Sequence, residues 1–311
     1  MLETADSSAW SETSVGPSGR ETVRSGSRIS VTFDLWETLV IDEPEWDLAR
    51  RKMRCEGLHH VLSRSGIDLG LEELLRGYDE SAHWLLSVWK ENHETTTNEQ
   101  IRYIVRAASR KTTVLPDDPR VVSALEEAYV RPVLTLPPRL NGDVISILQR
   151  MQDHVHRLGI VSNTGRTPGR VLRRLLRQLG IEEFFRATVF SDEVGWRKPD
   201  RRIFATASEM LGVRSSSILH IGDNPEADVW GAKQAGMRAL LLDYEVPDGF
   251  RTQPSSLFAL TRSMRRIDES EIKPDGRIRS LEEALDFIDS LPTAGEPLHG
   301  RKPTDHAGAE E

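Results

Sequence analysis

Short apolar segments recur along the chain, and this repetition limits the folds that it can adopt. There are five such segments, and stretches with helical spacing separate the later ones. They are 29–33, 157–161, 187–190, 218–221 and 238–242. Short apolar strands that alternate with helices are typical of a mostly parallel sheet with helices on both faces. The pattern therefore predicts an α/β protein.

The long stretch between the first two apolar segments has a different pattern. Within 44–135, apolar residues recur every three or four positions, which predicts amphipathic helices. Breaks are expected at 68–70 and 95–98, where Asn98, or else Thr97, would cap the following helix. We expect a helical bundle inserted into a core made of 29–43 and 136–290. Trp84 and Trp89 are expected in the core of this bundle, although with His83 they could instead line a substrate pocket.

Composition excludes several classes of protein. The net charge of -8 argues against binding to nucleic acid or to an anionic membrane. No apolar run is long enough to span a bilayer, and no signal peptide is evident, so a cytoplasmic protein is expected. The single cysteine, Cys55, is expected to pack in a helix. Residues 1–28 and 291–311 have the composition of disordered tails. Segment 246–275 and the oligomeric state allow no prediction.

Near the end of the chain, a further strand and helix are expected. Residues 277–288 read as a short strand that leads into a helix. Ser280 is suited to cap that helix, with Glu283 three residues later as its capping-box partner.

Polar and charged residues follow the predicted strands. In an open parallel sheet, ligands bind at the carboxyl ends of the strands, so these residues are expected to converge. Each residue alone is common in turns, but together they could hold one hard cation and one anion. The residues are Asp34, Ser162, Asn163, Thr164, Ser191, Asp192, Lys198, Asp223, Asn224, Asp228 and Asp243.

Four motifs give the chain a strong resemblance to the haloacid dehalogenase superfamily of hydrolases. They are FDLWETL at 33–39, VSN at 161–163, RKPD at 197–200 and HIGDNPEAD at 220–228. Their order and their positions after predicted strands make the match specific. The resemblance covers about 29–288. It implies a Rossmann-like parallel core with an α-helical cap domain formed by the insert.

The resemblance also implies a nucleophile and a metal site. Asp34 would attack phosphorus or carbon and form a covalent intermediate that water hydrolyses. Asp34, Asp223 and the backbone carbonyl of Trp36 would bind Mg²⁺, which prefers oxygen ligands. Asp228 would act through a water molecule or by orienting a ligand.

Other residues would hold the substrate. Ser162 and the backbone N–H of Asn163 would bind the phosphoryl oxygens. Lys198 would neutralise negative charge on the nucleophile and on the transferring group. Thr38 would form a hydrogen bond near the nucleophile.

One position departs from the phosphatase pattern. Phosphatases of the superfamily carry a second Asp where this chain has Trp36, and that Asp protonates the leaving group. Three hypotheses follow. The chain could be a Mg²⁺-dependent phosphohydrolase limited to good leaving groups, or helped by another acid such as Glu37. It could be a 2-haloacid dehalogenase, because those enzymes have an aromatic residue there. It could also be a ligand- or partner-binding protein with little turnover.

The fourth motif favours the first hypothesis. Dehalogenases of the superfamily need no metal and typically have Ser and Asn where this chain has Gly222 and Asp223. Their halide-binding arginine could correspond to any of several cap residues: Arg50, Arg51, Arg54 or Arg64. Phosphonoacetaldehyde hydrolases also lack the second Asp, but their cap lysine is not recognisable in Lys52 or Lys90. We therefore expect hydrolysis of a small phosphorylated metabolite through an aspartyl-phosphate, with the substrate itself unpredicted.

Overall fold

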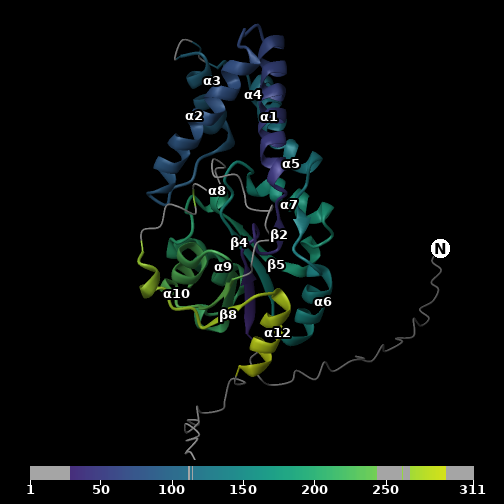
Figure 1. Ribbon diagram of the computed structural model, residues 1–311, viewed down its shortest axis with the longest axis vertical. Coiled ribbons are helices and arrows are strands. Elements are labelled where there is room, and N and C mark those ends of the chain that lie inside the picture. Colours follow the sequence, from purple (N-terminus) through teal and green to yellow (C-terminus); the bar gives the residue numbers. More distant parts are fainter. Residues whose placement is uncertain (1–28, 111–112, 114, 244–260, 262–266, 292–311) are drawn as a thin grey trace, which may run out of the picture.

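The protein is described here from a computed structural model that covers 29–110, 113, 115–243, 261 and 267–291 (Figure 1). Both predicted tails lie outside these residues, except for residue 291, and so does most of segment 246–275. In the described part, no helix is long and apolar enough to cross a membrane.

In the described part of the chain, six parallel strands form the central sheet, and five of them come from the predicted apolar segments. The order is β5-β4-β1-β6-β7-β8, with the first strand of the chain in the middle. Val31 of β1 pairs with Leu158 of β4 on one side and with Leu219 of β6 on the other. The strands are β1 (Ser30–Phe33), β4 (Leu158–Ser162), β5 (Phe185–Phe190), β6 (Ile218–Gly222), β7 (Arg238–Leu242) and β8 (Gly276–Ile278).

Helices cover both faces of the sheet, because alternate residues of each buried strand point to opposite sides. Ile160 and Leu240 belong to one hydrophobic cluster, with α6 (Val144–His154), α7 (Gly169–Gln178) and α12 (Leu281–Ser290). Their neighbours Val161 and Leu241 belong to the other, with α9 (Arg201–Leu211), η3 (Pro225–Trp230) and α10 (Gly231–Gln234). Short helices complete the core: α8 (Ser191–Val194), η1 (Glu182–Phe184), η2 (Ser215–Ser217) and η4 (Glu269–Glu271).

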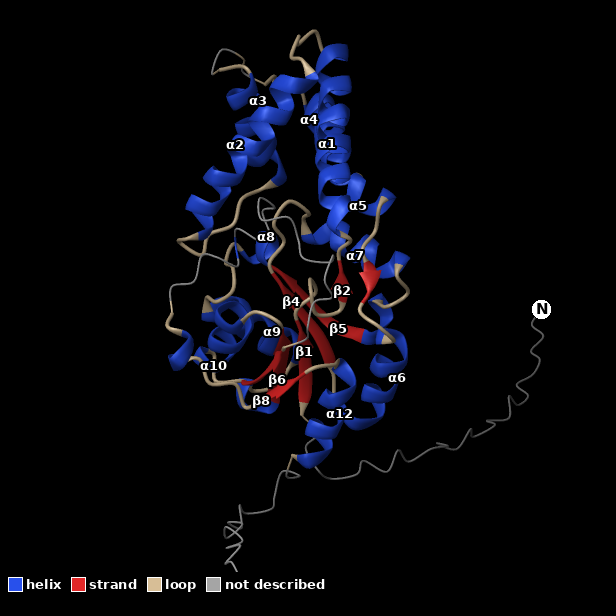
Figure 2. Cartoon of the chain, viewed as in Figure 1, coloured by secondary structure: helices blue, strands red, loops and turns tan. Residues whose placement is uncertain are grey.

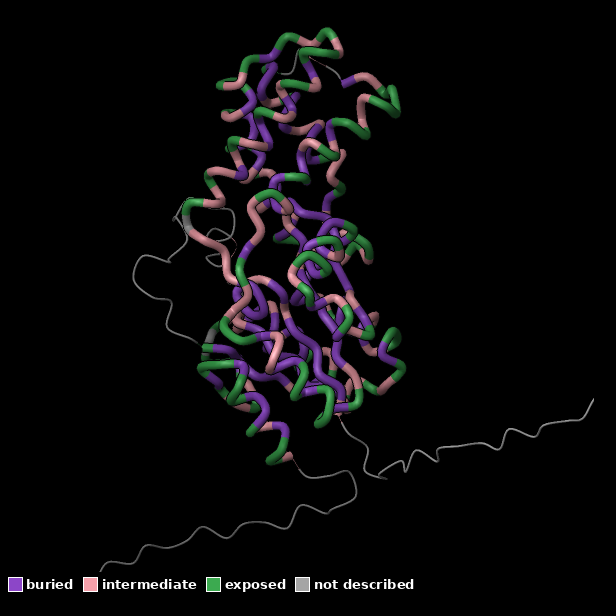
Figure 3. Tube along the Cα trace, turned by 90° about the vertical axis from the view of Figure 1, so that its right-hand side faces the viewer, coloured by how far each residue is buried: buried purple, intermediate pink, exposed green. Residues whose placement is uncertain are grey.

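The insert is helical and stands over one end of the sheet (Figure 2). The chain leaves the core through β2 (Val40–Ile41) and returns through β3 (Arg139–Leu140), which pair antiparallel. Between them lie α1 (Pro44–Arg64), α2 (Leu71–Trp89), α3 (Thr97–Ala108), α4 (Pro119–Val130) and α5 (Pro132–Thr135). We call residues 44–135 the cap. Buried positions continue from the core into the cap, where Leu58 and Ile104 belong to the same hydrophobic cluster as Ile160 (Figure 3).

The first turns of α12 and α3 show whether the two predicted N-cap residues are correct. Ser280 caps α12, as expected, by accepting a hydrogen bond from the Glu283 N–H. The predicted cap of α3 was wrong, because Thr96 holds that position. The Thr96 hydroxyl accepts from the Glu99 N–H at 3.2 Å, and the Glu99 carboxylate accepts from the Thr96 N–H at 2.7 Å. This reciprocal pair makes Thr96 the better cap, since Glu99 lies three residues after it.

Candidate active site

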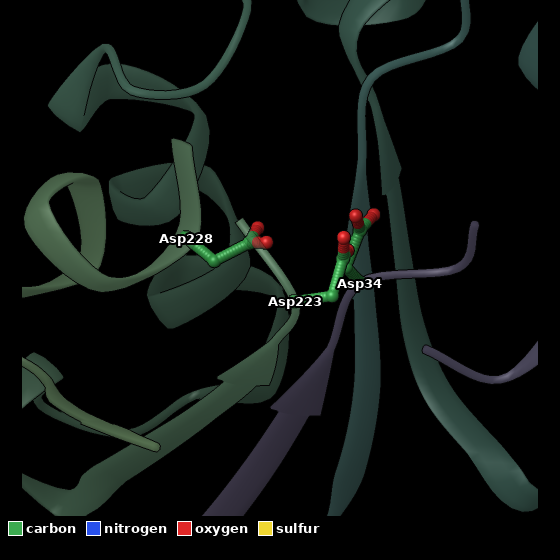
Figure 4. Close-up of side chains that lie close together, drawn as sticks. All are labelled: Asp34, Asp223 and Asp228. Atoms are coloured by element: carbon green, nitrogen blue, oxygen red, sulfur yellow. The ribbon is translucent and has the colours of Figure 1, made fainter. Parts of the chain in front are cut away.

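Three carboxylates meet at the carboxyl end of the central strands (Figure 4). Asp34 directly follows β1 and Asp223 directly follows β6, while Asp228 comes from η3. One carboxylate oxygen from each lies within 4.8 Å of the others. The structure therefore brings together three of the residues that the sequence predicted to converge.

Lys198 lies between two of these carboxylates. Its Nζ is 2.9 Å from Oδ1 of Asp34 and 2.6 Å from Oδ1 of Asp228. It also donates a hydrogen bond to the Val161 carbonyl at 2.8 Å. The ammonium group thus contacts the predicted nucleophile, as the charge-neutralising role requires.

The side chain of Asn163 holds the lysine in place. Asn163 Oδ1 accepts from the Lys198 N–H at 2.8 Å, and Asn163 Nδ2 donates to the Lys198 carbonyl at 3.2 Å. The sequence predicted a substrate-binding role for the Asn163 backbone and missed this side-chain role. Ser162 ends β4 next to Asn163, and its hydroxyl makes a long contact of 3.5 Å to the Asn163 carbonyl.

Burial and the lysine set the charges of the site. Burial raises the pKa of Asp34, although Lys198 opposes that effect. Burial would also raise the pKa of Asp228, but Lys198 and His220 outweigh it and hold that pKa below its usual range. The pKa of Lys198 is raised because Asp228 and Asp34 outweigh the opposite effect of burial. Asp228 and Lys198 therefore form an ionised pair beside Asp34.

Asp228 is fixed by two further groups. Its Oδ1 lies 3.2 Å from His220 Nε2, and its Oδ2 accepts from the Asn224 N–H at 2.9 Å. Burial lowers the pKa of His220, so the imidazole is neutral. When the imidazole proton is on Nε2, this nitrogen donates to Asp228, and Nδ1 accepts a hydrogen bond from the Thr32 hydroxyl at 3.0 Å. His220 was not among the predicted site residues, although a histidine inside an apolar strand was a visible signal.

Because Gly222 has no side chain, the Asp228 carboxylate can occupy the space beside it. A Cβ atom at position 222 would lie 2.3 Å from Asp228 Cγ and 2.4 Å from its Oδ2. Any side chain there would displace the carboxylate. The dehalogenase-type serine at this position is therefore incompatible with the observed place of Asp228.

The turn after the nucleophile holds Asp34 through the backbone. The Leu35 N–H donates to Asp34 Oδ1 at 2.7 Å. Glu37 has a left-handed backbone, with φ of 58°, and is buried. Among the described residues, the buried hydroxyl of Thr38 has no hydrogen-bond partner, so the bond expected near the nucleophile is not formed there. Trp36 is half-buried beside them.

The cluster fits a hard divalent cation. It offers carboxylate oxygens within one small space, which is the donor set that Mg²⁺ prefers. Both oxygens of Asp228 already accept from protein donors. Asp228 therefore suits the indirect role that the sequence suggested, and Asp34 and Asp223 remain the predicted direct ligands.

One loop of the cap contacts the core beside Lys198. Glu94, between α2 and α3, forms a buried ion pair with Arg197 and accepts from the Ser191 hydroxyl at 2.5 Å. Trp89 donates from Nε1 to Glu94 at 2.8 Å, and its ring lies 4.0 Å from the Arg197 guanidinium carbon. Trp89 is buried as predicted, but at the junction of cap and core.

The remaining candidates lie elsewhere in the cap. Trp84 is half-buried and stacks on Tyr103, and His83 is exposed. Cys55 is buried in α1 as predicted, and burial raises the pKa of its thiol to about 12.

The cap arginines differ in their partners. Arg50 pairs with Asp42 at 2.6 Å and Arg51 with Asp79 at 2.5 Å. Arg64 is exposed at the end of α1. Arg54 is buried, and in the described part of the chain it forms no ion pair.

Comparisons with known proteins found similar sequences. A family model described as haloacid dehalogenase-like hydrolase matches residues 30–236. The chain is 28% identical over 250 residues to a glyceraldehyde 3-phosphate phosphatase of Methanopyrus kandleri, covering 76% of this chain and 98% of that protein. It is 41% identical over 113 residues to a phosphoserine phosphatase of Thermus thermophilus, covering 36% of this chain and 38% of that protein.

Solved structures show the same fold. The chain is similar to a 2-haloacid dehalogenase of Pseudomonas syringae pv. Tomato DC3000, with a TM-score of 0.55, 20% identity, and 84% and 98% of the two chains covered. It is also similar to the HAD-hydrolase YfnB of Bacillus subtilis, solved bound to magnesium, with a TM-score of 0.52 and 20% identity. That match covers 85% of this chain and 99% of the other.

Proposed function

The chain belongs to the haloacid dehalogenase-like hydrolases, and we propose that it hydrolyses a small phosphorylated metabolite in a Mg²⁺-dependent reaction with Asp34 as nucleophile. The observation that carries this proposal is the arrangement of the charged groups. Three carboxylate oxygens lie within 4.8 Å of one another, and the Lys198 ammonium contacts Asp34 at 2.9 Å. This site can neutralise an anionic substrate and keep a carboxylate ready to attack it.

The first step would form a covalent intermediate. A carboxylate oxygen of Asp34 would bond to phosphorus as the bond from phosphorus to the leaving oxygen breaks. Lys198 would neutralise part of the charge on Asp34 and on the phosphoryl group. Asp34 and Asp223 would hold the Mg²⁺, which when bound supplies positive charge beside the phosphoryl oxygens.

The second step would regenerate the enzyme. Water would attack phosphorus of the aspartyl-phosphate, releasing inorganic phosphate and restoring the Asp34 carboxylate. Ser162 and the Asn163 N–H would bind phosphoryl oxygens in both steps. The Thr38 hydroxyl, which has no hydrogen-bond partner within the described ranges, would be a further donor for them. The backbone carbonyl of Trp36 remains a predicted metal ligand.

Trp36 restricts the reaction. Its side chain cannot give a proton to a departing alkoxide, a contribution that is typically worth ~10²–10⁴-fold in rate. We therefore propose good leaving groups, or an acid delivered from the cap or the substrate. The phosphatase names of the relatives, with glyceraldehyde 3-phosphate and phosphoserine as substrates, support a small phosphate monoester.

Dehalogenation is the competing function, and Trp36 is the observation that favours it. Two observations oppose it. Asp223 is present in the carboxylate cluster, where dehalogenases typically have Asn. Asp228 occupies the space that a serine side chain at position 222 would need. For these reasons we place phosphate hydrolysis first.

The test is an activity assay on the full chain. Purified protein is assayed on p-nitrophenyl phosphate and acetyl phosphate, with Mg²⁺ and with EDTA, and on 2-chloropropionate for halide release. We expect metal-dependent phosphate release. In Asp34→Asn it should fall by about 10⁴-fold or more, the scale seen when a catalytic nucleophile is removed.

Asp243→Asn is the matched control. Asp243 follows β7 as Asp34 follows β1, but its side chain is 63% exposed and pairs with Arg277 at 3.0 Å. We expect wild-type rates from this variant. Metal-independent halide release would overturn the proposal in favour of a dehalogenase. Absence of turnover on a broad panel of substrates, with ligand binding retained, would favour a binding protein.

A further inference from the structure

Two arginines are buried where the cap meets the core. Arg54 lies on α1 of the cap, and Arg166 lies in the core loop between β4 and α7. Their side chains come from opposite sides of the junction, and the residues are 4% and 8% exposed. Arginine is rarely buried to this extent unless an opposite charge accompanies it.

The hydrogen-bond partners that these arginines have among the described residues are all neutral. Arg54 donates to the Tyr129 carbonyl and the Tyr78 hydroxyl, both at 3.1 Å, and to the Thr167 hydroxyl at 3.5 Å. Arg166 donates to the Tyr129 hydroxyl at 2.8 Å, the Ser81 hydroxyl at 3.0 Å and the Tyr78 carbonyl at 3.3 Å. Burial raises the pKa of Tyr129, so its hydroxyl stays protonated and brings no negative charge.

Two carboxylates at this junction form ion pairs, but with other arginines. Asp42 pairs with Arg50, and Glu94 pairs with Arg197. The charge of Asp47 contributes to raising the pKa of Arg166, but the two side chains are too far apart to form an ion pair. Within the described part of the chain, neither Arg54 nor Arg166 has a carboxylate within 4.0 Å. The junction therefore carries two buried positive charges that no adjacent acidic group balances.

Aromatic contacts offset only part of the cost of burying these charges. The guanidinium carbon of Arg166 lies 3.8 Å from the Tyr78 ring centroid, and that of Arg54 lies 5.5 Å from the Tyr129 centroid. Such contacts contribute about 0.5–2 kcal/mol each, whereas removing a charge from water costs several kcal/mol. An anion between the two guanidinium groups would supply the missing charge, and the planar fork of arginine suits carboxylate and phosphate oxygens.

The pair lies on the side of the core that carries Asp34. Arg166 follows Ser162 by four residues, so their Cα atoms are at most about 15 Å apart. The cap helices stand over the end of the sheet where the loop of Arg166 begins (Figure 1). Asp34 follows β1 and the loop of Arg166 follows the neighbouring strand β4, so both lie at the same end of the sheet.

We propose that Arg54 and Arg166 bind a second acidic group of the substrate, so that the preferred substrates are phosphate monoesters that also carry a carboxylate. This inference rests on the proposed phosphatase function and narrows its substrate class. One arginine comes from the cap and the other from the core. The acidic group would therefore also hold the cap against the core.

Matched three-carbon substrates test the proposal. Glycerol 3-phosphate and 3-phosphoglycerate differ at one end, where the first has a hydroxymethyl group and the second a carboxylate. We expect wild-type kcat/KM to be at least about 10-fold higher for 3-phosphoglycerate, because charged hydrogen bonds contribute about 1.5–3 kcal/mol each. Arg166→Gln and Arg54→Gln should remove that preference, mainly through a higher KM for the acid. The kcat/KM for a three-carbon 1,3-bisphosphate measures whether a second phosphate can replace the carboxylate.

Arg174→Gln is the control variant. Arg174 also joins core to cap, through an exposed pair with Glu127 at 3.7 Å, and its loss should leave the preference at the wild-type value. If a glutamine variant fails to melt cooperatively, Arg166→Lys keeps the charge and tests the loss of the fork. Equal kcat/KM for the two substrates in the wild type would overturn the proposal. So would an equal loss on both in the variants, since a purely structural tie between cap and core would act in that way.

A binding measurement separates this inference from the proposed function. Calorimetry with 3-phosphoglycerate and Asp34→Asn protein needs no turnover. Binding about 10-fold or more weaker in Asp34→Asn/Arg166→Gln would support the acidic-group site even if the wild type hydrolysed no phosphate. Equal binding by the two proteins would overturn it, whatever the activity assay shows.

Discussion

Replacing Gly222 with Ala should disrupt both the fold and the site. The new Cβ would lie 2.3 Å from Asp228 Cγ, so the carboxylate must move by about 1 Å to reach an ordinary contact of 3.4 Å. That movement breaks or stretches the bonds of Asp228 to Lys198 at 2.6 Å and to the Asn224 N–H at 2.9 Å. Lys198, which is 4% exposed, would lose its stronger anionic partner.

The size of the effect follows from those bonds. Hydrogen bonds to charged groups contribute about 1.5–3 kcal/mol each, so losing one or two should lower the free energy of unfolding by about 1.5–6 kcal/mol. A displacement of about 1 Å in groups that position the reaction typically costs ~10²-fold in rate. Urea unfolding and kcat/KM for p-nitrophenyl phosphate measure the two effects.

Gly276→Ala separates lost stability from lost catalysis. There a Cβ would lie 2.9 Å from Leu240 Cδ2 and 3.0 Å from the Phe287 ring, in the core beside β8. We expect this variant to lose stability and keep wild-type kcat/KM at a temperature where it is folded. A Gly222→Ala protein with the urea midpoint and kcat/KM of the wild type would refute the assigned role of Asp228.

Four further predictions concern other parts of the molecule. Trp36→Asp should raise kcat/KM for an alkyl phosphate relative to p-nitrophenyl phosphate, by up to ~10²-fold; an unchanged ratio would show that another group supplies the acid. Mg²⁺ at about 100 times its Kd should stabilise the wild type by about 2.7 kcal/mol in thermal melts, an effect that EDTA and Asp223→Asn should each abolish. Gly77→Ala should destabilise the protein by about 1–3 kcal/mol in urea, because its Cβ would lie 2.5 Å from the Ile104 carbonyl where α2 meets α3. The thiol of Cys55, with its pKa raised to about 12, should resist a disulfide reagent at pH 8 until urea unfolds the protein, and fast native labelling would contradict its burial.

The sheet could be predicted because its strands are short, buried and separated by helical segments. Val31 and Phe33 point into one cluster, and strands buried on both faces read as continuous apolar runs. Convergence of Asp34 and Asp223 followed from topology, since parallel strands end at the same edge. The parallel order and the helices on both faces confirm this part of the reasoning.

The hydrogen bonds around Asp228 could not be predicted from the same pattern. The alternation along β6 indicates which face His220 occupies, but not that its Nε2 meets Asp228 eight residues later. That contact depends on the turn after Gly222, whose missing side chain admits the carboxylate. The N-cap residue of α3 was also not determined by the sequence pattern alone. Three consecutive threonines could each cap the helix, and the position of Glu99 selects Thr96.

The junction between cap and core was beyond sequence reasoning for a different reason. Glu94 and Arg197 are 103 residues apart, and Arg54 reaches Thr167 across 113 residues. No local pattern shows which loop of an inserted bundle rests on which loop of the core. Contacts of this kind depend on how the cap packs against the core. For the same reason, Arg54 could not be distinguished from the other cap arginines before the structure was known.

The central claim is that Asp34 becomes phosphorylated, and acid-quenched labelling tests it most directly. Wild-type protein is mixed with radiolabelled acetyl phosphate and Mg²⁺, quenched in acid within one turnover, and digested for peptide mapping. We predict label on the peptide that contains Asp34, lost with EDTA and absent from Asp34→Asn, while Asp243→Asn is labelled like the wild type. Label on a different residue, or phosphate release by Asp34→Asn at the wild-type rate, would contradict the proposed mechanism.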